Sequence, residues 1–155
     1  MHAGEAALRY FLDTEYDGWG GALISLALVA ESGEELYLVL DHQPADPWVQ
    51  RHVMPYLDSV PDSLRSPRLP RAAAAEALAF FLGGDPDALI IADWPEDIAQ
   101  MSMLLVTGPG TMVALPSLRF QLAALTGFST AANSAVPHNA LHDARSLRDH
   151  WTGLD

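Results

Sequence analysis

The apolar residues in the first part of this chain gather into three short runs separated by polar or glycine-rich segments. These runs are Leu8–Asp13, Ala22–Ala30 and Glu35–Leu40. Apolar runs of this length, bounded by turn residues, are typical of β-strands. Because only Glu31-Ser32-Gly33-Glu34 separates the second run from the third, we expect three consecutive strands that form a meander.

The pattern in the rest of the chain favours helices around one further buried strand. We expect helices at Pro47–Val53, at Arg71–Leu82, from about Pro95 to Val106 and from about Asn139 to Trp151. Ala88–Ala92 suits a strand buried on both faces, Leu118–Leu125 fits either a helix or a strand, and residues 54–70 are rich in proline and predict an irregular surface segment. Together these elements indicate one α/β domain over residues 1–155, with a mixed sheet.

Composition narrows the class of protein. Half of the 155 residues are apolar (50%), which is enough to bury a core and argues against disorder. No stretch reaches the roughly 20 apolar residues that span a bilayer, and Met1–Leu8 lacks the features of a signal peptide. There is no cysteine, which excludes disulfides, thiolate zinc sites and a cysteine nucleophile. We therefore expect a cytoplasmic enzyme without membrane contact.

The charge balance adds a constraint on nucleic-acid binding. Twenty acidic residues face eight basic ones, all of them arginine, and the formal net charge is −12. A broad basic surface for phosphates is therefore not expected. The negative charge of the protein repels phosphates. This repulsion is smaller near carboxylates that hold metal ions, because the bound cations make the local electrostatic potential positive.

Asp13-Thr14-Glu15 supplies the first candidate metal ligands, at the end of the first predicted strand. Side chains alternate along a strand, so Asp13 and Glu15 project to the same side. Two neighbouring carboxylates repel each other unless they share a cation. The alternative is an ordinary polar strand end that leads into a turn.

A second acidic group, Asp93 to Asp97, directly follows the buried strand Ala88–Ala92. Asp93, with Glu96 three residues later, resembles a capping box at a helix start, which gives Asp93 a structural role. Asp97 instead heads an apolar stripe at helical spacing, formed with Met101, Leu104 and Leu105. An aspartate on a core-facing stripe is costly to bury without a partner, so we assign Asp97 rather than Asp93 as a ligand.

The third group lies at the start of the last predicted helix. Asn139 is the expected N-cap, His138 precedes it, and Asp143 lies in the second turn. His138 would then stand on a loop above a site into which Asp143 points. The alternative is a histidine near a helix start and a solvated aspartate.

Taken together, the three groups resemble the DEDD-type 3′-5′ exonucleases of the histidine subgroup, in the ribonuclease H-like superfamily. The first motif matches as Asp13 and Glu15, and the third as His138, Ala140, Asp143 and Ala144. The second departs from the usual Asn-Ala-x-Phe-Asp pattern and keeps only its final aspartate, Asp97. The resemblance spans Asp13 to Ala144, and the short layout is similar to small stand-alone bacterial exoribonucleases.

The resemblance implies a ribonuclease H-like mixed β-sheet flanked by helices and a site for two divalent cations, Mg²⁺ or Mn²⁺. By analogy, Asp13 would bridge the ions, Glu15 and Asp143 would complete the water-activating site, and Asp97 would support the second ion. His138 would act as general base, a role that suits a group titrating near neutrality.

The substrate implied by the resemblance is the 3′ end of single-stranded RNA, an overhang or a short oligonucleotide. Three alternatives remain at this point: a DNA-directed exonuclease with the same site, a non-catalytic nucleic-acid-binding module on this fold, and a single-metal phosphoesterase for small nucleotides. A homodimer would supply additional arginines from a neighbouring chain.

Several other residues have two interpretations each. Trp19 would stack on a terminal base or cover the sheet edge, and for Trp94 packing is favoured over substrate contact. Arg65, Arg68 and Arg71 form a basic cluster that would either contact the phosphate backbone or belong to a solvated loop and helix start. We expect His42 and His52 to face solvent rather than bind metal, and His142 to lie on a helix surface.

Overall fold

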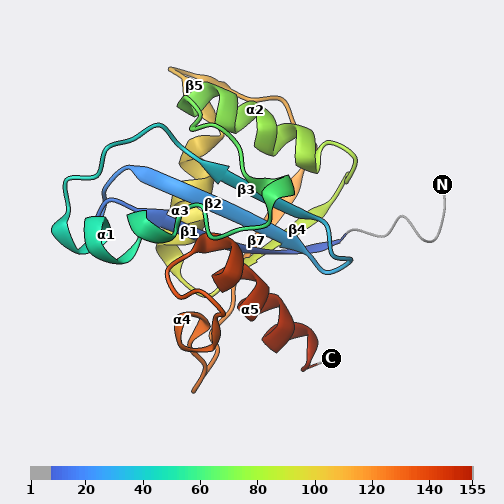
Figure 1. Ribbon diagram of the computed structural model, residues 1–155. Helices are drawn as coiled ribbons and strands as arrows, with labels where there is room; N and C mark the ends of the chain where they lie inside the picture. The colour runs from blue at the N-terminus through green and yellow to red at the C-terminus, as the bar shows by residue number, and fades with distance from the viewer. Residues whose placement is uncertain (1–7, 155) are drawn as a thin grey trace.

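A five-stranded mixed sheet forms the centre of the molecule, in the order β3-β2-β1-β4-β7 (Figure 1). Its strands are β1 (Arg9–Tyr16), β2 (Leu23–Ala30), β3 (Glu35–Val39), β4 (Ala88–Ala92) and β7 (Leu118–Leu122). The computed structural model describes residues 8–154. The expectation that Met1–Leu8 is not a signal peptide therefore concerns residues that, apart from Leu8, lie outside the described part of the chain. The first three strands form the predicted antiparallel meander, whereas β4 and β7 run parallel to β1.

Helices cover both faces of this sheet. They are α1 (Pro47–His52), α2 (Arg71–Leu82), α3 (Pro95–Leu104), α4 (Thr130–Asn133) and α5 (Ala140–Thr152). Figure 1 shows α2 and α3 on one face and α5 on the other. None of the helices in residues 8–154 combines the length and apolar character needed to cross a bilayer.

Alternation along the strands supplies two cores. On the α2/α3 face, Leu12 and Leu28 pack in a cluster with Leu78 of α2 and Met101 of α3. On the opposite face, residues of β2 pack against α5. This cluster contains Ile24, Ala27 and Val29 of β2 together with Leu141 and Ala144 of α5. Because both faces are covered, every residue of β2 is buried, as its continuous apolar run indicates.

The predicted elements agree with the structure except where pairing or packing between distant segments decides the outcome. β1 continues through Asp13 and Glu15 to Tyr16, because its hairpin pairing with β2 continues as far as Leu23. The ambiguous segment Leu118–Leu125 contains a strand over Leu118–Leu122, which pairs with β4. The small hairpin of β5 (Val106–Gly108) and β6 (Thr111–Met112) and the short helix α4 were not predicted.

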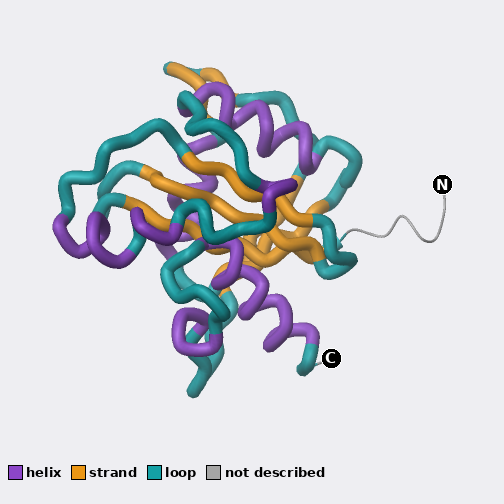
Figure 2. The backbone as a smooth tube through the Cα atoms, in the orientation of Figure 1, coloured by secondary structure: helices purple, strands orange, loops and turns teal. Residues whose placement is uncertain are grey.

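The segment 54–70 differs from the irregular surface segment that its prolines predict. It contains two 3-10 turns, Met54–Tyr56 and Asp62–Leu64. Leu57 and Val60 are buried in the core beneath α5, so part of this segment packs inside the protein. Figure 2 shows how the loops between β3 and α2 carry α1 along one side of the sheet.

Candidate metal centre at the carboxyl ends of β1 and β4

Parallel pairing between β1 and β4 places two aspartates beside each other at one edge of the sheet. Phe11 of β1 lies opposite Ile91 of β4, and each is followed two residues later by an aspartate, Asp13 and Asp93. The carboxyl ends of parallel strands meet at the same edge, where open α/β sheets commonly bind ligands. Carboxylate oxygens of Asp13, Asp93 and Asp97 lie within 4.8 Å of one another.

Asp97 lies in the first turn of α3 and is only 3% exposed. Thr14 of β1 donates two hydrogen bonds to the Asp97 carboxylate. Its backbone N–H and its hydroxyl both donate to Asp97 Oδ1, at 3.2 and 2.6 Å. Met101, Leu104 and Leu105 are buried as the helical stripe predicts. The core therefore fixes the helix, and Thr14 fixes the direction of the carboxylate at its start.

Asp93 belongs to this carboxylate group, although the sequence interpretation gave it a structural role instead. The predicted capping box is absent, because the N-cap of α3 is Trp94 and no side chain accepts a hydrogen bond at this helix start. Glu96 instead accepts a hydrogen bond from the Gly20 backbone N–H at 3.0 Å. Asp93 lies beside Asp13 and Asp97, where burial raises its pKa and a hydrogen bond with the Thr130 side chain partly opposes that rise. Its position directly after a buried strand was the signal that could have identified it.

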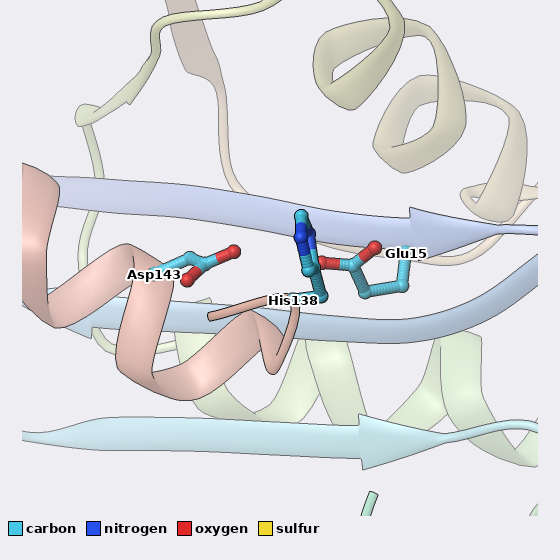
Figure 3. A group of neighbouring side chains, drawn as sticks. All are labelled: Glu15, His138 and Asp143. Carbon is cyan, nitrogen blue, oxygen red and sulfur yellow. The ribbon is translucent and has the colours of Figure 1, made fainter. Parts of the chain in front are cut away.

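A second group consists of Glu15, His138 and Asp143, whose ligand atoms also lie within 4.8 Å of one another. Figure 3 shows the His138 side chain between the two carboxylates, with Glu15 extending from β1 and Asp143 from α5. The structure therefore brings together all five sequence-predicted residues at one sheet edge, divided between two adjoining groups.

The N-cap of α5 sets the positions of His138 and Asp143. The Asn139 side-chain oxygen accepts hydrogen bonds from the backbone N–H groups of Leu141 and His142, at 3.1 and 3.3 Å. The Asn139 amide nitrogen donates to the Tyr56 carbonyl at 2.8 Å, which ties the helix start to the loop after α1. Asn139 is fully buried, so this predicted cap is also a tertiary anchor.

His138 has an uncommon backbone conformation and an aromatic neighbour. Its φ of 67° lies in the left-handed region, and His138 is the one non-glycine residue with positive φ among the described residues. Strained backbone of this kind persists where surrounding contacts hold it, and it concentrates at functional sites. The His138 ring packs edge-on against Trp48 of α1, with ring centroids 4.9 Å apart and planes at 78°.

A chain of hydrogen bonds holds Trp48 in turn. The Asp46 carboxylate caps α1 by accepting from the Trp48 N–H at 2.8 Å. Asp17, four residues beyond Asp13, accepts from the Ala45 and Asp46 N–H groups at 2.8 and 2.9 Å. The same carboxylate pairs with the ring of His42 at 2.9 Å. The turn after β1 therefore organises the loop that supports His138.

The other histidines have structural contacts. His42 is partly buried against Asp17 rather than solvent-facing, and His52 packs its ring on Trp48 at a centroid distance of 4.7 Å. His142 lies on the side of α5, where its ring nitrogen contacts the Ser59 carbonyl at 2.7 Å. Within the described residues, none of these three belongs to a group with metal-ligand spacing.

The crowded carboxylates raise one another's pKa. Burial, followed by the charges of Asp97, Glu15, Asp143 and Asp93, raises the pKa of Asp13 well above its usual range. The charges of all the other carboxylates of the site therefore contribute to the raised pKa of Asp13. Burial and the charges of Asp143 and Asp97 raise the pKa of Glu15 to about 9. Burial is also the main cause that raises the pKa of Asp97 to about 7 and that of Asp143 to about 6.

These carboxylates fit hard divalent cations. Asp13 Oδ2 and Asp143 Oδ1 are buried side-chain oxygens that have no hydrogen-bond partner among residues 8–154. No ion pair within residues 8–154 involves any of the five carboxylates, so no arginine neutralises them there. Buried carboxylates are ordinarily paired or bound to metal, and oxygen donors suit Mg²⁺ or Mn²⁺.

Aromatic side chains surround the open side of the site. Trp19, Trp48 and Trp94 line a hollow of about 440 Å³ that also includes Glu15. Trp19 is 96% exposed, so the interpretation that it covers the sheet edge is wrong. Trp94 is 58% exposed, so it is packed only in part and its remaining surface is open to solvent.

The predicted basic cluster divides in the structure. Arg65 pairs with Asp62 at 3.3 Å, and Arg68 pairs with Asp58 at 2.9 Å. The side chain of Arg71, at the start of α2, makes no hydrogen bond or ion pair with any described residue. Among the described residues, Arg71 is thus the one member of the cluster without an acidic partner.

Comparison with known proteins yields partial relatives. No family model matches the chain. Two proteins of Mycobacterium tuberculosis, from strains CDC 1551 and H37Rv, are both named 3′-5′ exoribonuclease and are each 47% identical to it over 55 residues. This match covers 32% of the chain and 33% of each relative, so the chain aligns with about a third of their length.

Proposed function

We propose that this protein is a metal-dependent 3′-5′ exoribonuclease on a ribonuclease H-like fold. The observation that carries the proposal is the meeting of five carboxylates and His138 at one edge of the sheet. The central position of β1 in a mixed sheet flanked by helices supports the fold assignment. The name of the M. tuberculosis relatives supports the direction of attack and the choice of RNA.

Two groups of ligands suggest two cations. Asp13, Asp93 and Asp97 would hold one, and Glu15 and Asp143 would hold the other, with Asp13 close to both groups. When bound, such a pair of Mg²⁺ or Mn²⁺ ions lowers the pKa of a bound water and stabilises charge on the leaving 3′ oxygen. The orphaned oxygens of Asp13 and Asp143 are available as ligands.

The protein's own side chains then position the water and move its proton. A water between Glu15 and Asp143 lies within reach of the His138 ring, which accepts the proton as the water oxygen attacks phosphorus. The bond from phosphorus to the 3′ oxygen breaks and releases the terminal nucleotide. Trp48 keeps the imidazole directed at this position through its edge-on contact.

The substrate is an RNA 3′ end that is single-stranded. Exposed tryptophans beside Glu15 offer surfaces on which unpaired bases stack. A net charge of −12 disfavours long-range attraction of RNA, so binding depends on the ions and on stacking. The rival with the same site is a DNA-directed exonuclease.

Labelled oligonucleotides test the proposal. Single-stranded RNA and DNA of one sequence, labelled at the 5′ end, are incubated with the protein and Mn²⁺. We expect an RNA ladder that shortens one nucleotide at a time from the 3′ end, and its loss in Asp13→Ala and Asp143→Asn. Internal cuts, or release of phosphate alone, would contradict the proposal, and faster shortening of DNA would establish the rival.

A further inference from the structure

A second groove adjoins the candidate site on the far side of Trp19. It has a volume of about 570 Å³, within the range of small-molecule sites, and apolar walls that include Pro95, Ala99 and Met103. Trp19 and Glu96 line both this groove and the hollow that contains Glu15, so the two adjoin at these residues. Arg71, at the start of α2, also lines the groove.

Arg71 is exceptional among the basic residues. Most arginines in the described chain pair with a carboxylate, such as Arg119 with Asp87 and Arg145 with Glu35. Within residues 8–154, the arginines without such a partner are Arg51 and Arg71, and only Arg71 lines this groove. An unneutralised guanidinium is therefore held beside an apolar groove in a strongly acidic protein.

We propose that this groove binds the upstream nucleotides of a single-stranded RNA whose 3′ end lies in the metal centre, and that Arg71 contacts a backbone phosphate there. This inference rests on the proposed function. It adds a subsite that makes the enzyme favour oligonucleotides longer than two residues.

The chemistry of the groove fits that occupant. Apolar and aromatic walls accept bases without sequence preference, and the planar guanidinium forms paired hydrogen bonds to phosphate oxygens. Glu96, the acidic residue in the lining of the groove, accepts a hydrogen bond from the Gly20 N–H at 3.0 Å, which offsets part of its repulsion of phosphate. A purely apolar peptide would leave the charge of Arg71 unmatched.

Substrate length separates this subsite from the metal centre. An unphosphorylated dinucleotide has only the scissile phosphate, whereas a pentanucleotide with the same 3′ sequence has upstream phosphates as well. We expect Arg71→Gln to lower the ratio of their kcat/KM values, pentanucleotide over dinucleotide, by about tenfold, as for loss of a charge-assisted hydrogen bond. Arg119→Gln removes the same charge from β7, outside this groove, and leaves the ratio unchanged.

A binding measurement gives a readout that does not need hydrolysis. Fluorescence anisotropy of a labelled pentanucleotide is compared on Asp143→Asn and on Asp143→Asn with Arg71→Gln, over a range of salt concentrations. The second variant binds more weakly, and its plot of log affinity against log salt is shallower by about 0.7, the contribution of one phosphate contact in single strands.

The outcomes distinguish the two proposals. If the wild-type protein hydrolyses neither substrate, the proposed function fails, and the binding comparison alone decides the groove. Equal affinities and equal salt slopes for the two binding variants would overturn the subsite. An effect of Arg119→Gln as large as that of Arg71→Gln would also overturn it, because net charge would then explain both.

Discussion

His138 and Trp48 show how single residues position the proposed chemistry. His138 has a left-handed φ of 67°, a cost that the buried cap Asn139 and the Trp48 contact offset together. Thr14 has a similar supporting role for Asp97, since it directs one carboxylate oxygen by two hydrogen bonds. The positions of His138 and Asp97 therefore depend on these neighbouring residues as well as on their own backbone.

Replacing the proposed base tests its role directly. We expect His138→Ala to lower kcat by about 10²- to 10⁴-fold, the usual range for loss of a general base. Trp48→Ala keeps the imidazole but removes its support, so a smaller loss in kcat is expected. The measurement is single-turnover hydrolysis of RNA over a range of pH. Near-full activity of His138→Ala would show that another group accepts the proton.

Asp93 is the residue whose role the structure changes most. If it is a ligand beside Asp13 and Asp97, then Asp93→Asn weakens binding of one of two Mn²⁺ ions by roughly tenfold or more. Isothermal titration calorimetry measures this loss. Asp87→Asn is the matched control, because Asp87 is exposed and pairs only with Arg119. Unchanged Mn²⁺ affinity in Asp93→Asn would return Asp93 to a purely structural role.

At the scale of elements, the start of α5 joins the fold to the site. Asn139 caps this helix and also donates to the Tyr56 carbonyl, which links α5 to the 3-10 turn after α1. The first turns of α5 then carry Asp143, and the preceding residue is His138. A change at this cap therefore affects both stability and the proposed base.

The substitution Asn139→Ala tests how much this cap contributes to the stability of the protein. Loss of the cap costs about 1 kcal/mol. The hydrogen bond from Asn139 to the Tyr56 carbonyl is lost as well, although that carbonyl still accepts from the Ser59 N–H at 3.1 Å. We therefore expect the free energy of unfolding to fall by more than about 1 kcal/mol. Urea denaturation gives the value. Ser129→Ala removes the N-cap of the short, exposed α4 and should cost less. A larger loss for Ser129→Ala would show that the tertiary link from Asn139 contributes little.

For the whole molecule, the carboxylate site makes stability depend on pH and metal. The pKa values of Asp143, Asp97 and Glu15 are raised to about 6, 7 and 9 in the folded protein. Because these pKa values are higher in the folded than in the unfolded protein, the folded state binds protons to these carboxyl groups more tightly. Their stabilising contribution is present below the unfolded pKa, near 4, and is lost as pH rises through these folded values.

A thermal melting series tests this dependence. In EDTA, we expect Tm to fall between about pH 5 and pH 9, and Mn²⁺ should raise Tm most at the higher pH. The net charge of −12 also contributes to a fall, so Asp143→Asn serves as the comparison, with a shallower slope because one buried charge is gone. A metal-free Tm that rises across this range would contradict the assignment.

Local patterns in the sequence determined the elements and most of the candidate ligands. The apolar runs predicted the meander and the buried strand β4, and helical spacing placed Asp97 at the head of a buried stripe. The residue type and position of Asn139 predicted the cap of α5. These features depend on side-chain period and on backbone hydrogen bonds within a few residues, which a sequence displays directly.

Only the tertiary structure decided how distant segments meet. The register of β1 against β4 put Asp93 beside Asp13, and pairing with β4 made Leu118–Leu122 a strand. Packing of α1 against the loop before α5 placed Trp48 against His138, and within residues 8–154 the fold left Arg71 without an acidic partner. Such contacts join residues that are far apart along the chain, so their free energy depends on the relative placement of whole elements and leaves no local pattern in the sequence.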